Sequence, residues 1–84
     1  MDVIQAHQFS SNNRKAILES GKCGCFYCMA IFAPNKIIEW IDEGGVRIGE
    51  TALCPKCDID SVIGDKDVMD ITPEFLQKMH AYWF

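Results

Sequence analysis

Two Cys-x-x-Cys pairs constrain the fold of this chain more than any other feature. The first pair is Cys25 and Cys28, the second is Cys54 and Cys57, and 25 residues separate them. Such a turn brings two thiolates to one ion while backbone N–H groups of the turn point at the sulfurs. Two turns complete a tetrahedral shell, and four cysteines are typical of structural zinc. We therefore predict a metal site with Zn²⁺ as the cofactor and Cys25, Cys28, Cys54 and Cys57 as ligands.

Three other side chains offer alternative ligands. Cys23 lies two residues before Cys25 and could replace it, while His7 and His80 each carry an imidazole. The Cys25 and Cys28 spacing matches the second pair, so this is the simplest set. We expect Cys23 to be a small buried residue beside the turn and the two histidines to be ordinary helix residues. A rubredoxin-like iron site would accept the same two turns, and the sequence leaves iron and zinc both open.

Catalysis has little support in the sequence. A closed four-cysteine site leaves no open position for water, and neither pair opens a helix beside a βαβ unit, as thioredoxin-type exchange requires. Gly-rich phosphate loops, Gly-x-Ser-x-Gly and His-Glu-x-x-His are absent, and Ser61 has no visible base. We predict that the chain is not an enzyme. The enzymatic alternative is an open zinc site or a reactive Cys23.

The length of 84 residues predicts one domain, residues 1–84, that needs its metal for stability. A chain this short buries only about 60% of its unfolded surface. Eight Lys and Arg against twelve Asp and Glu give a net charge of −4. This charge argues against general nucleic-acid binding, which depends on Lys and Arg contacts to phosphates. It favours a protein partner, with a basic protein as the best match in charge, and leaves a nucleic-acid-binding zinc finger as a weaker alternative.

The cellular setting follows from the same sequence. The first 20 residues lack the basic start and apolar run of a signal peptide, and no stretch has the roughly 18 apolar residues of a membrane span. We therefore expect a cytoplasmic protein that does not enter a membrane. In a reducing cytosol, paired cysteines are more often metal ligands than disulfides, and the total of five fits a disulfide set poorly.

Periodicity and turn residues predict an α+β fold with flanking helices. Residues 1–20 form a helical segment, either one helix or two short ones broken at residues 10–13, with Gly21 as the stop. Residues 21–84 form the metal core. Pro34 opens a middle helix over residues 34–43 that Gly44 and Gly45 end.

Strands and a final helix complete the prediction. Residues 46–48 and 51–53 form a small hairpin around Gly49, and residues 59–63 form another short strand. Thr72 and Pro73 start the last helix, which places four apolar residues on one face: Phe75, Leu76, Met79 and Trp83.

Two surface features remain. Five aspartates lie within residues 58–70, but they do not match the calcium-loop template, so we interpret them as a solvated acidic turn. The run Tyr82-Trp83-Phe84 cannot face inward as a whole from one helix, which makes it a candidate contact surface.

Several motifs together resemble a family of small, uncharacterised bacterial cytoplasmic proteins. They are Cys23-Gly24-Cys25-Phe26-Tyr27-Cys28, then Ala52-Leu53-Cys54-Pro55-Lys56-Cys57, then Ile59-Asp60-Ser61-Val62-Ile63-Gly64-Asp65, and the ending Met79-His80 with Trp83-Phe84. The resemblance covers residues 21–84 and implies a zinc-finger-like domain. More distantly, the two Cys-x-x-Cys turns look like the knuckles of zinc ribbons and treble-clef domains.

Besides the enzymatic alternative, these observations lead to one functional hypothesis and two alternatives. We expect a non-enzymatic zinc-binding interaction module that recognises a protein partner. The first alternative is an immunity or inhibitor protein whose acidic face neutralises a basic toxin or nuclease. The second is the nucleic-acid-binding zinc finger already mentioned.

Overall fold

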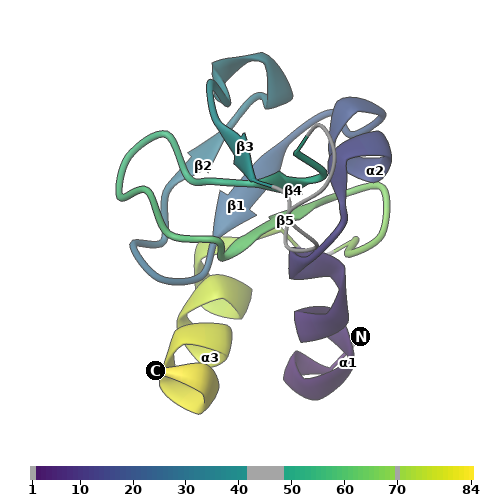
Figure 1. Ribbon diagram of the computed structural model, residues 1–84. Helices are drawn as coiled ribbons and strands as arrows, with labels where there is room; N and C mark the ends of the chain where they lie inside the picture. Colours follow the sequence, from purple (N-terminus) through teal and green to yellow (C-terminus); the bar gives the residue numbers. More distant parts are fainter. Residues whose placement is uncertain (1, 42–48, 70) are drawn as a thin grey trace.

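A three-stranded antiparallel sheet lies at the centre of the computed structural model of this chain (Figure 1). The structure describes residues 2–41, 49–69 and 71–84. The strand order is β2-β1-β5, with β1 at Cys23–Cys25, β2 at Ile31–Phe32 and β5 at Val62–Gly64. Gly24 pairs with Ile31 on one side and with Ile63 on the other. The α+β class is therefore confirmed, although the strand expected over residues 59–63 begins later and is shorter.

The N-terminal segment forms two short helices, one of the two predicted arrangements. Helix α1 spans Val3–His7, a 3₁₀ turn (η1) spans Gln8–Ser10, and α2 spans Arg14–Leu18. The Asp2 carboxylate accepts a hydrogen bond of 2.8 Å from the Gln5 N–H and so caps α1. The break therefore lies in the polar cluster where it was expected.

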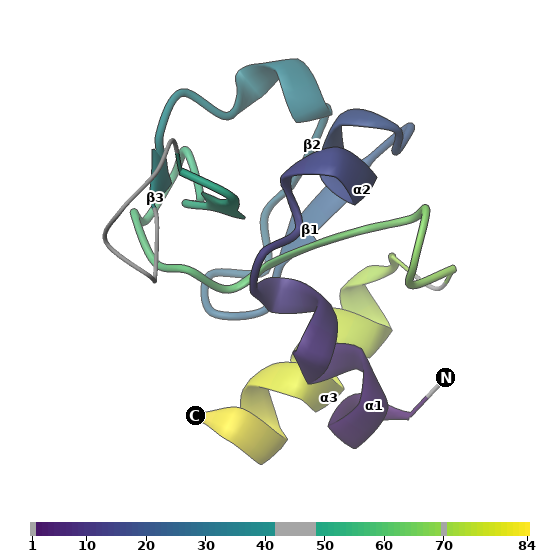
Figure 2. The ribbon, with the colours of Figure 1, turned by 45° about the vertical axis from the view of Figure 1, so that its right-hand side comes forward.

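Helix α3, Pro73–Trp83, begins at the predicted residue. The Thr72 hydroxyl accepts a hydrogen bond of 3.2 Å from the Phe75 N–H, and Pro73 occupies the first turn, where a missing N–H costs nothing. The helix buries Phe75, Leu76 and Met79 and contacts α1, which lies beside it below the sheet (Figure 2). Trp83 is only partly buried, and its indole N–H donates to the Val3 carbonyl at 2.8 Å.

The middle helix predicted over residues 34–43 is wrong in the part that the structure describes. Only the 3₁₀ turn η2, Pro34–Lys36, is helical. Ile37 is already extended, and Ile38 is 82% exposed rather than packed on a helix face. Several β-branched residues in a short segment favour extended backbone. The chain then continues into β3, Trp40–Ile41.

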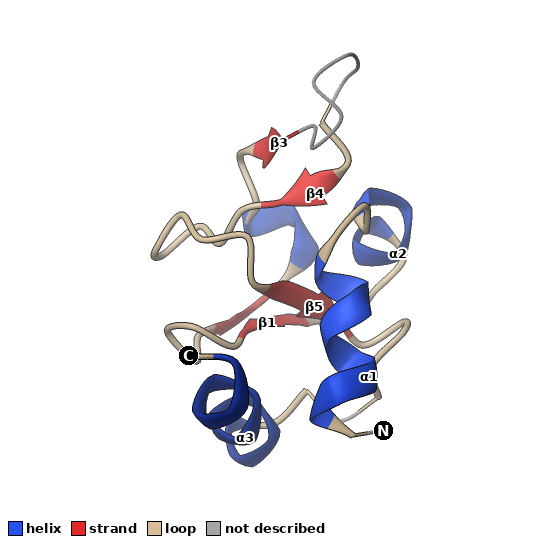
Figure 3. Cartoon of the chain, turned by 60° about the horizontal axis from the view of Figure 1, so that its bottom comes forward, coloured by secondary structure: helices blue, strands red, loops and turns tan. Residues whose placement is uncertain are grey.

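Residues 51 and 52 pair with a strand that the sequence did not predict. Strand β4, Thr51–Ala52, pairs antiparallel with β3, so that Trp40 faces Ala52 and Ile41 faces Thr51. Figure 3 shows this pair lying apart from β1 and β5. The strand expected at residues 46–48 lies outside the described residues. The segment predicted to be helical therefore supplies one strand of the hairpin.

Two apolar clusters cover opposite sides of the central sheet. One joins α1, α3 and β5 and is made of Ala6, Phe26, Ile63, Val68, Ile71, Phe75, Leu76 and Met79. The other surrounds the cysteines and is made of Ile17, Cys23, Cys25, Phe32, Ile37, Ala52, Cys54 and Val62. Gly24 lets α3 approach the sheet, because a Cβ there would lie 2.9 Å from Leu76 Cδ1. Among the described residues, no helix is long and apolar enough to cross a membrane.

Buried Asn13 ties the N-terminal segment to both sheets. Its amide nitrogen donates to the Phe9 carbonyl at 2.9 Å and to the Val62 carbonyl at 2.8 Å. Its amide oxygen accepts a hydrogen bond of 3.1 Å from the Ala52 N–H. The side chain makes no capping bond to α2. The Asn13 side chain therefore hydrogen-bonds to β4 and β5 and does not cap α2.

Candidate metal centre

The sulfurs of the four predicted ligands lie together at one place in the fold. Sγ atoms of Cys25, Cys28, Cys54 and Cys57 are all within 4.8 Å of one another. The Cys25 and Cys57 sulfurs are 3.6 Å apart, and those of Cys28 and Cys54 are 3.7 Å apart. Zinc–sulfur bonds of about 2.3 Å place the sulfurs of a tetrahedral site about 3.8 Å from one another. The spacing is therefore compatible with a four-coordinate metal ion.

The first Cys-x-x-Cys turn, here called the first knuckle, connects β1 to β2. The Cys25 N–H donates to the Ala30 carbonyl at 2.9 Å, and the Met29 N–H donates to the Cys25 carbonyl at 2.8 Å. Met29 has φ 63°, in the left-handed region, which reverses the chain directly after Cys28. The Tyr27 N–H points back to the Cys25 sulfur at 3.3 Å.

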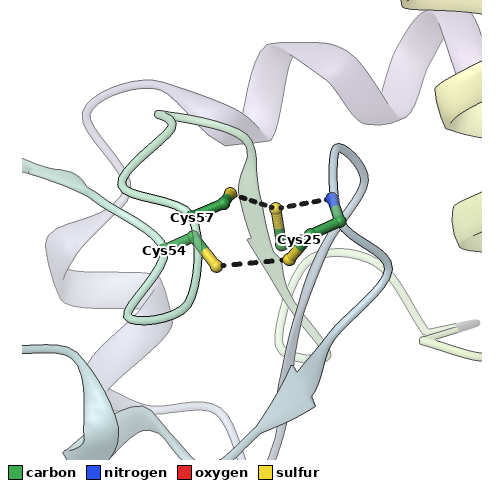
Figure 4. A group of neighbouring side chains, drawn as sticks. Cys25, Cys54 and Cys57 are labelled. Atoms are coloured by element: carbon green, nitrogen blue, oxygen red, sulfur yellow. Dashed lines mark hydrogen bonds between the residues drawn. The ribbon is translucent and has the colours of Figure 1, made fainter.

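The second knuckle, around Cys54 and Cys57, repeats this local structure bond for bond. Its Cys54 N–H donates to the Ile59 carbonyl at 3.0 Å, and its Asp58 N–H donates to the Cys54 carbonyl at 2.9 Å. Asp58 also has φ 63°, and the Lys56 N–H lies 3.3 Å from the Cys54 sulfur. Figure 4 shows the labelled cysteines of the two loops pointing toward one another. The two knuckles therefore form facing halves of one site.

Ser61 adds a side-chain partner that the sequence did not reveal. Its hydroxyl lies 3.0 Å from the Cys25 sulfur, and the residue is only 1% exposed. The Ser61 carbonyl accepts a hydrogen bond of 3.0 Å from the Phe26 N–H, which fixes the serine beside the first knuckle. From the sequence, Ser61 is only a candidate nucleophile, and no general base is visible for it. The one available signal was its position four residues after Cys57.

Hydrogen bonds and burial act in opposite directions on the thiols. Burial raises the pKa of Cys25, but hydrogen bonds from Ser61, from the N–H groups of Cys28 and Tyr27 and from Cys57 outweigh it and leave this pKa below its ordinary value. Burial raises the pKa of Cys54 despite the N–H groups of Lys56 and Cys57. The pKa of Cys57 is also raised, and burial is the largest cause.

Mutual repulsion of the thiolates contributes to these shifts. The charge of Cys25 raises the pKa of both Cys54 and Cys57. A divalent cation reverses this effect, because a coordinating thiol is deprotonated. The pKa of Cys25 is therefore lowered, whereas the raised pKa values of Cys54 and Cys57 mean that these two thiols gain most from a nearby cation.

The four cysteines are not equally accessible. Cys25 and Cys54, the first members of the two pairs, are fully buried, whereas Cys28 and Cys57 are half-buried. The first members also accept the backbone N–H···S bonds. Solvent therefore reaches the site from the side of Cys28 and Cys57.

The alternative ligands lie outside the cluster. Cys23 is fully buried in β1, and burial, with a smaller effect of Asp65, raises the pKa of its thiol to about 12. His80 Nδ1 lies 3.2 Å from the Phe26 carbonyl oxygen, and the His7 ring packs 3.9 Å from the Trp83 ring, measured between centroids. The interpretation of Cys23 as a small buried residue is confirmed.

The described residues of the acidic segment form no comparable group. Within the described part of the chain, the four cysteines are the only set of three or more metal-binding side chains close enough to share an ion. Asp58 and Asp60 are exposed, and the Asp65 carboxylate accepts a hydrogen bond of 2.8 Å from the Gly21 N–H.

Comparison of the chain with protein-family models, curated proteins and solved structures gave no match.

Proposed function

We propose that the chain is a non-enzymatic zinc-binding module whose four-cysteine site is structural and whose surface recognises a protein partner. The observation that carries the proposal is the convergence of four sulfurs within 4.8 Å of one another. Four such thiols repel one another when ionised, and a divalent cation removes that cost. Four protein ligands also leave no coordination position for a substrate.

The arrangement supports a zinc-ribbon-like fold. The first knuckle joins two antiparallel strands, β1 and β2, and the second knuckle leads to β5, which pairs with β1. The metal would thus join two loops at the same end of the sheet, where β1 ends at Cys25 and β5 begins at Val62. Iron is the alternative ion, because the same thiolate shell suits both metals.

Partner recognition is supported by an aromatic surface beside the first knuckle. The exposed rings are Tyr27, Tyr82, Trp83 and Phe84. Tyr27 belongs to the first knuckle, and its ring packs edge-on against that of Phe84 at 4.9 Å between centroids. Exposed aromatic groups of this kind are enriched at protein interfaces. Metal binding would hold Tyr27 in place and so maintain this surface.

Charge supports a protein rather than a nucleic acid as the partner. Four deprotonated cysteines and one divalent ion change the formal charge from −4 to about −6. A polyanion is repelled by such a surface. The family resemblance of residues 21–84 agrees with a small zinc-finger-like protein.

Metal analysis of the purified protein tests the proposal. We expect one zinc per chain in the wild type and loss of most zinc in Cys25→Ser, because this change removes a ligand. Cys23→Ser is the matched control, since it removes a neighbouring buried thiol outside the cluster. Substoichiometric zinc and iron in the wild type would contradict the proposal, as would equal zinc loss in both variants.

A capture experiment tests the aromatic surface. Tagged, zinc-loaded wild type and Phe84→Ala are compared, with Ile38→Ala as a control that removes an exposed apolar side chain elsewhere. A partner retained by the wild type and by Ile38→Ala but lost from Phe84→Ala supports the surface. Identical proteins bound to all three would argue against it.

A further inference from the structure

A solvent-open pocket of about 440 Å³ is lined by residues of β2 and of the second knuckle. Six residues line it: Ile31, Phe32, Ala33, Lys36, Pro55 and Lys56. They come from β2, from η2 and its approach, and from the second knuckle. The volume is in the range of sites that bind small molecules or peptide side chains.

The lining combines an apolar surface with two lysines. Phe32 is nearly buried, whereas Ile31 is 41% exposed. Lys36 and Lys56 are both exposed. The one ion pair formed among the described residues joins Lys66 to Glu19, so neither pocket lysine is neutralised by a described carboxylate. In a protein of charge −4, this pocket is a local cationic site.

The pocket also contains the outer edge of the central sheet. In the described structure β2 is an edge strand, with β1 on one side. The Cys25 N–H bonds the Ala30 carbonyl, so Cys25 and Ala30 form a hydrogen-bonded pair. Because such pairs alternate in an antiparallel ladder, Gly24 and Ile31 form a non-hydrogen-bonded pair. The Ile31 N–H and C=O therefore point away from β1, toward the outer edge.

We infer that this pocket binds an extended peptide segment in which an acidic side chain neighbours an apolar one. The peptide backbone pairs with Ile31 as an added strand, its apolar side chain packs on Phe32 and Pro55, and its carboxylate lies near Lys36 and Lys56. The inference goes beyond the proposed function by adding a second binding surface with a stated ligand chemistry. It also gives the second knuckle a direct role, since Pro55 and Lys56 lie between two metal ligands.

Other occupants fit the pocket less well. A nucleic acid needs a wider cationic surface than two lysines on an acidic protein provide. A free inorganic anion would use the lysines but neither the apolar lining nor the outward backbone groups of Ile31. The combination of strand edge, apolar lining and positive charge favours the acidic peptide.

Titration of the ¹⁵N-labelled, zinc-loaded full chain tests the inference. The probe is a synthetic seven-residue peptide of alternating valine and threonine with a central glutamate, and its partner probe has glutamine in that place. We expect amide shifts centred on Ile31, Phe32 and Lys56, and affinity about tenfold weaker for the glutamine peptide. Equal affinity for the two peptides, shifts confined to other surfaces, or equal shifts with inorganic phosphate would overturn the inference.

Matched variants separate the pocket from general charge effects. The double variant Lys36→Gln and Lys56→Gln should weaken binding of the glutamate peptide about tenfold, whereas Lys15→Gln with Lys78→Gln, two exposed lysines outside the lining, should leave it unchanged. Ile31→Pro removes the outward N–H at a strand edge that tolerates proline and should also weaken binding. Equal effects of both double variants would overturn the inference.

Measuring the zinc content of each variant distinguishes a failure of the peptide inference from a failure of the proposed function. A zinc-loaded wild type that fails to bind the glutamate peptide overturns the peptide inference and leaves the metal module standing. A wild type without metal contradicts the proposed function itself.

Discussion

The hydroxyl oxygen of Ser61 lies 3.0 Å from the sulfur of Cys25, and both side chains are buried. A hydroxyl that donates to a metal-bound thiolate holds the ligand in place and offsets its charge. We expect Ser61→Ala to lower zinc affinity about tenfold. Competition between the protein and a chromophoric chelator measures this change.

A second buried serine provides the control for Ser61. Ser10 is also buried, but its hydroxyl donates to the His7 carbonyl at 2.7 Å, away from the sulfurs. Ser10→Ala should therefore leave zinc affinity unchanged even if it lowers stability. An equal loss of affinity in the two variants would mean that Ser61 acts only through packing.

Removal of the metal should unfold the chain. Binding of structural zinc supplies on the order of 10 kcal/mol in small domains, and the short strands here leave little else to hold the two knuckles together. With excess chelator and a reductant present, we expect loss of near-UV circular dichroism and of amide dispersion. Both signals should return on addition of zinc. A native spectrum in the metal-free, reduced protein would contradict a structural role.

Cys23 should resist alkylation in the folded, zinc-loaded protein. Its thiol is fully buried, and burial raises its pKa to about 12, so the reactive thiolate is scarce at neutral pH. Treatment with iodoacetamide at pH 7 followed by peptide mass spectrometry should find Cys23 unmodified until denaturant is added. Rapid modification in the native protein would instead support a reactive thiol and revive the enzymatic alternative.

Asn13→Ala should destabilise the fold by about 3 kcal/mol. The change leaves the Val62 carbonyl and the Ala52 N–H without the hydrogen bonds that Asn13 supplies, and each unsatisfied buried group costs about 1–3 kcal/mol. Urea unfolding at fixed free zinc measures the loss. Asn35→Ala, an exposed residue of η2, is the matched control and should change stability by less than about 0.5 kcal/mol. A similar effect of both changes would show that the Asn13 bonds contribute little.

The parts of the fold that depend on local sequence were predictable. The Cys-x-x-Cys spacing identified each of the two knuckles, and Thr72 with Pro73 identified the start of α3, because in each case the interacting groups lie within a few residues. The convergence of the two knuckles on one site was expected because zinc takes four ligands. The polar cluster likewise located the break between α1 and α2.

Long-range contacts were not predictable from the same patterns. The apolar pattern of residues 37–41 is compatible with a helix or with a strand. The pairing of Trp40 with Ala52 stabilises the strand. Asn13 belongs to the polar cluster at the predicted helix break, yet its partners are as distant as Val62. Ser61 reaches Cys25 only because β5 pairs with β1. Each of these contacts depends on pairing between distant segments, which a single sequence does not display.

The matching hydrogen bonds of the two knuckles have a kinetic consequence. Each knuckle closes within six residues, so either can form early and hold the ion with two sulfurs while the rest of the chain is still unfolded. The slow step is then closure of the 25-residue segment between Cys28 and Cys54, at an entropy cost of about 3 kcal/mol. Refolding should therefore become faster as free zinc rises and then reach a plateau set by that closure.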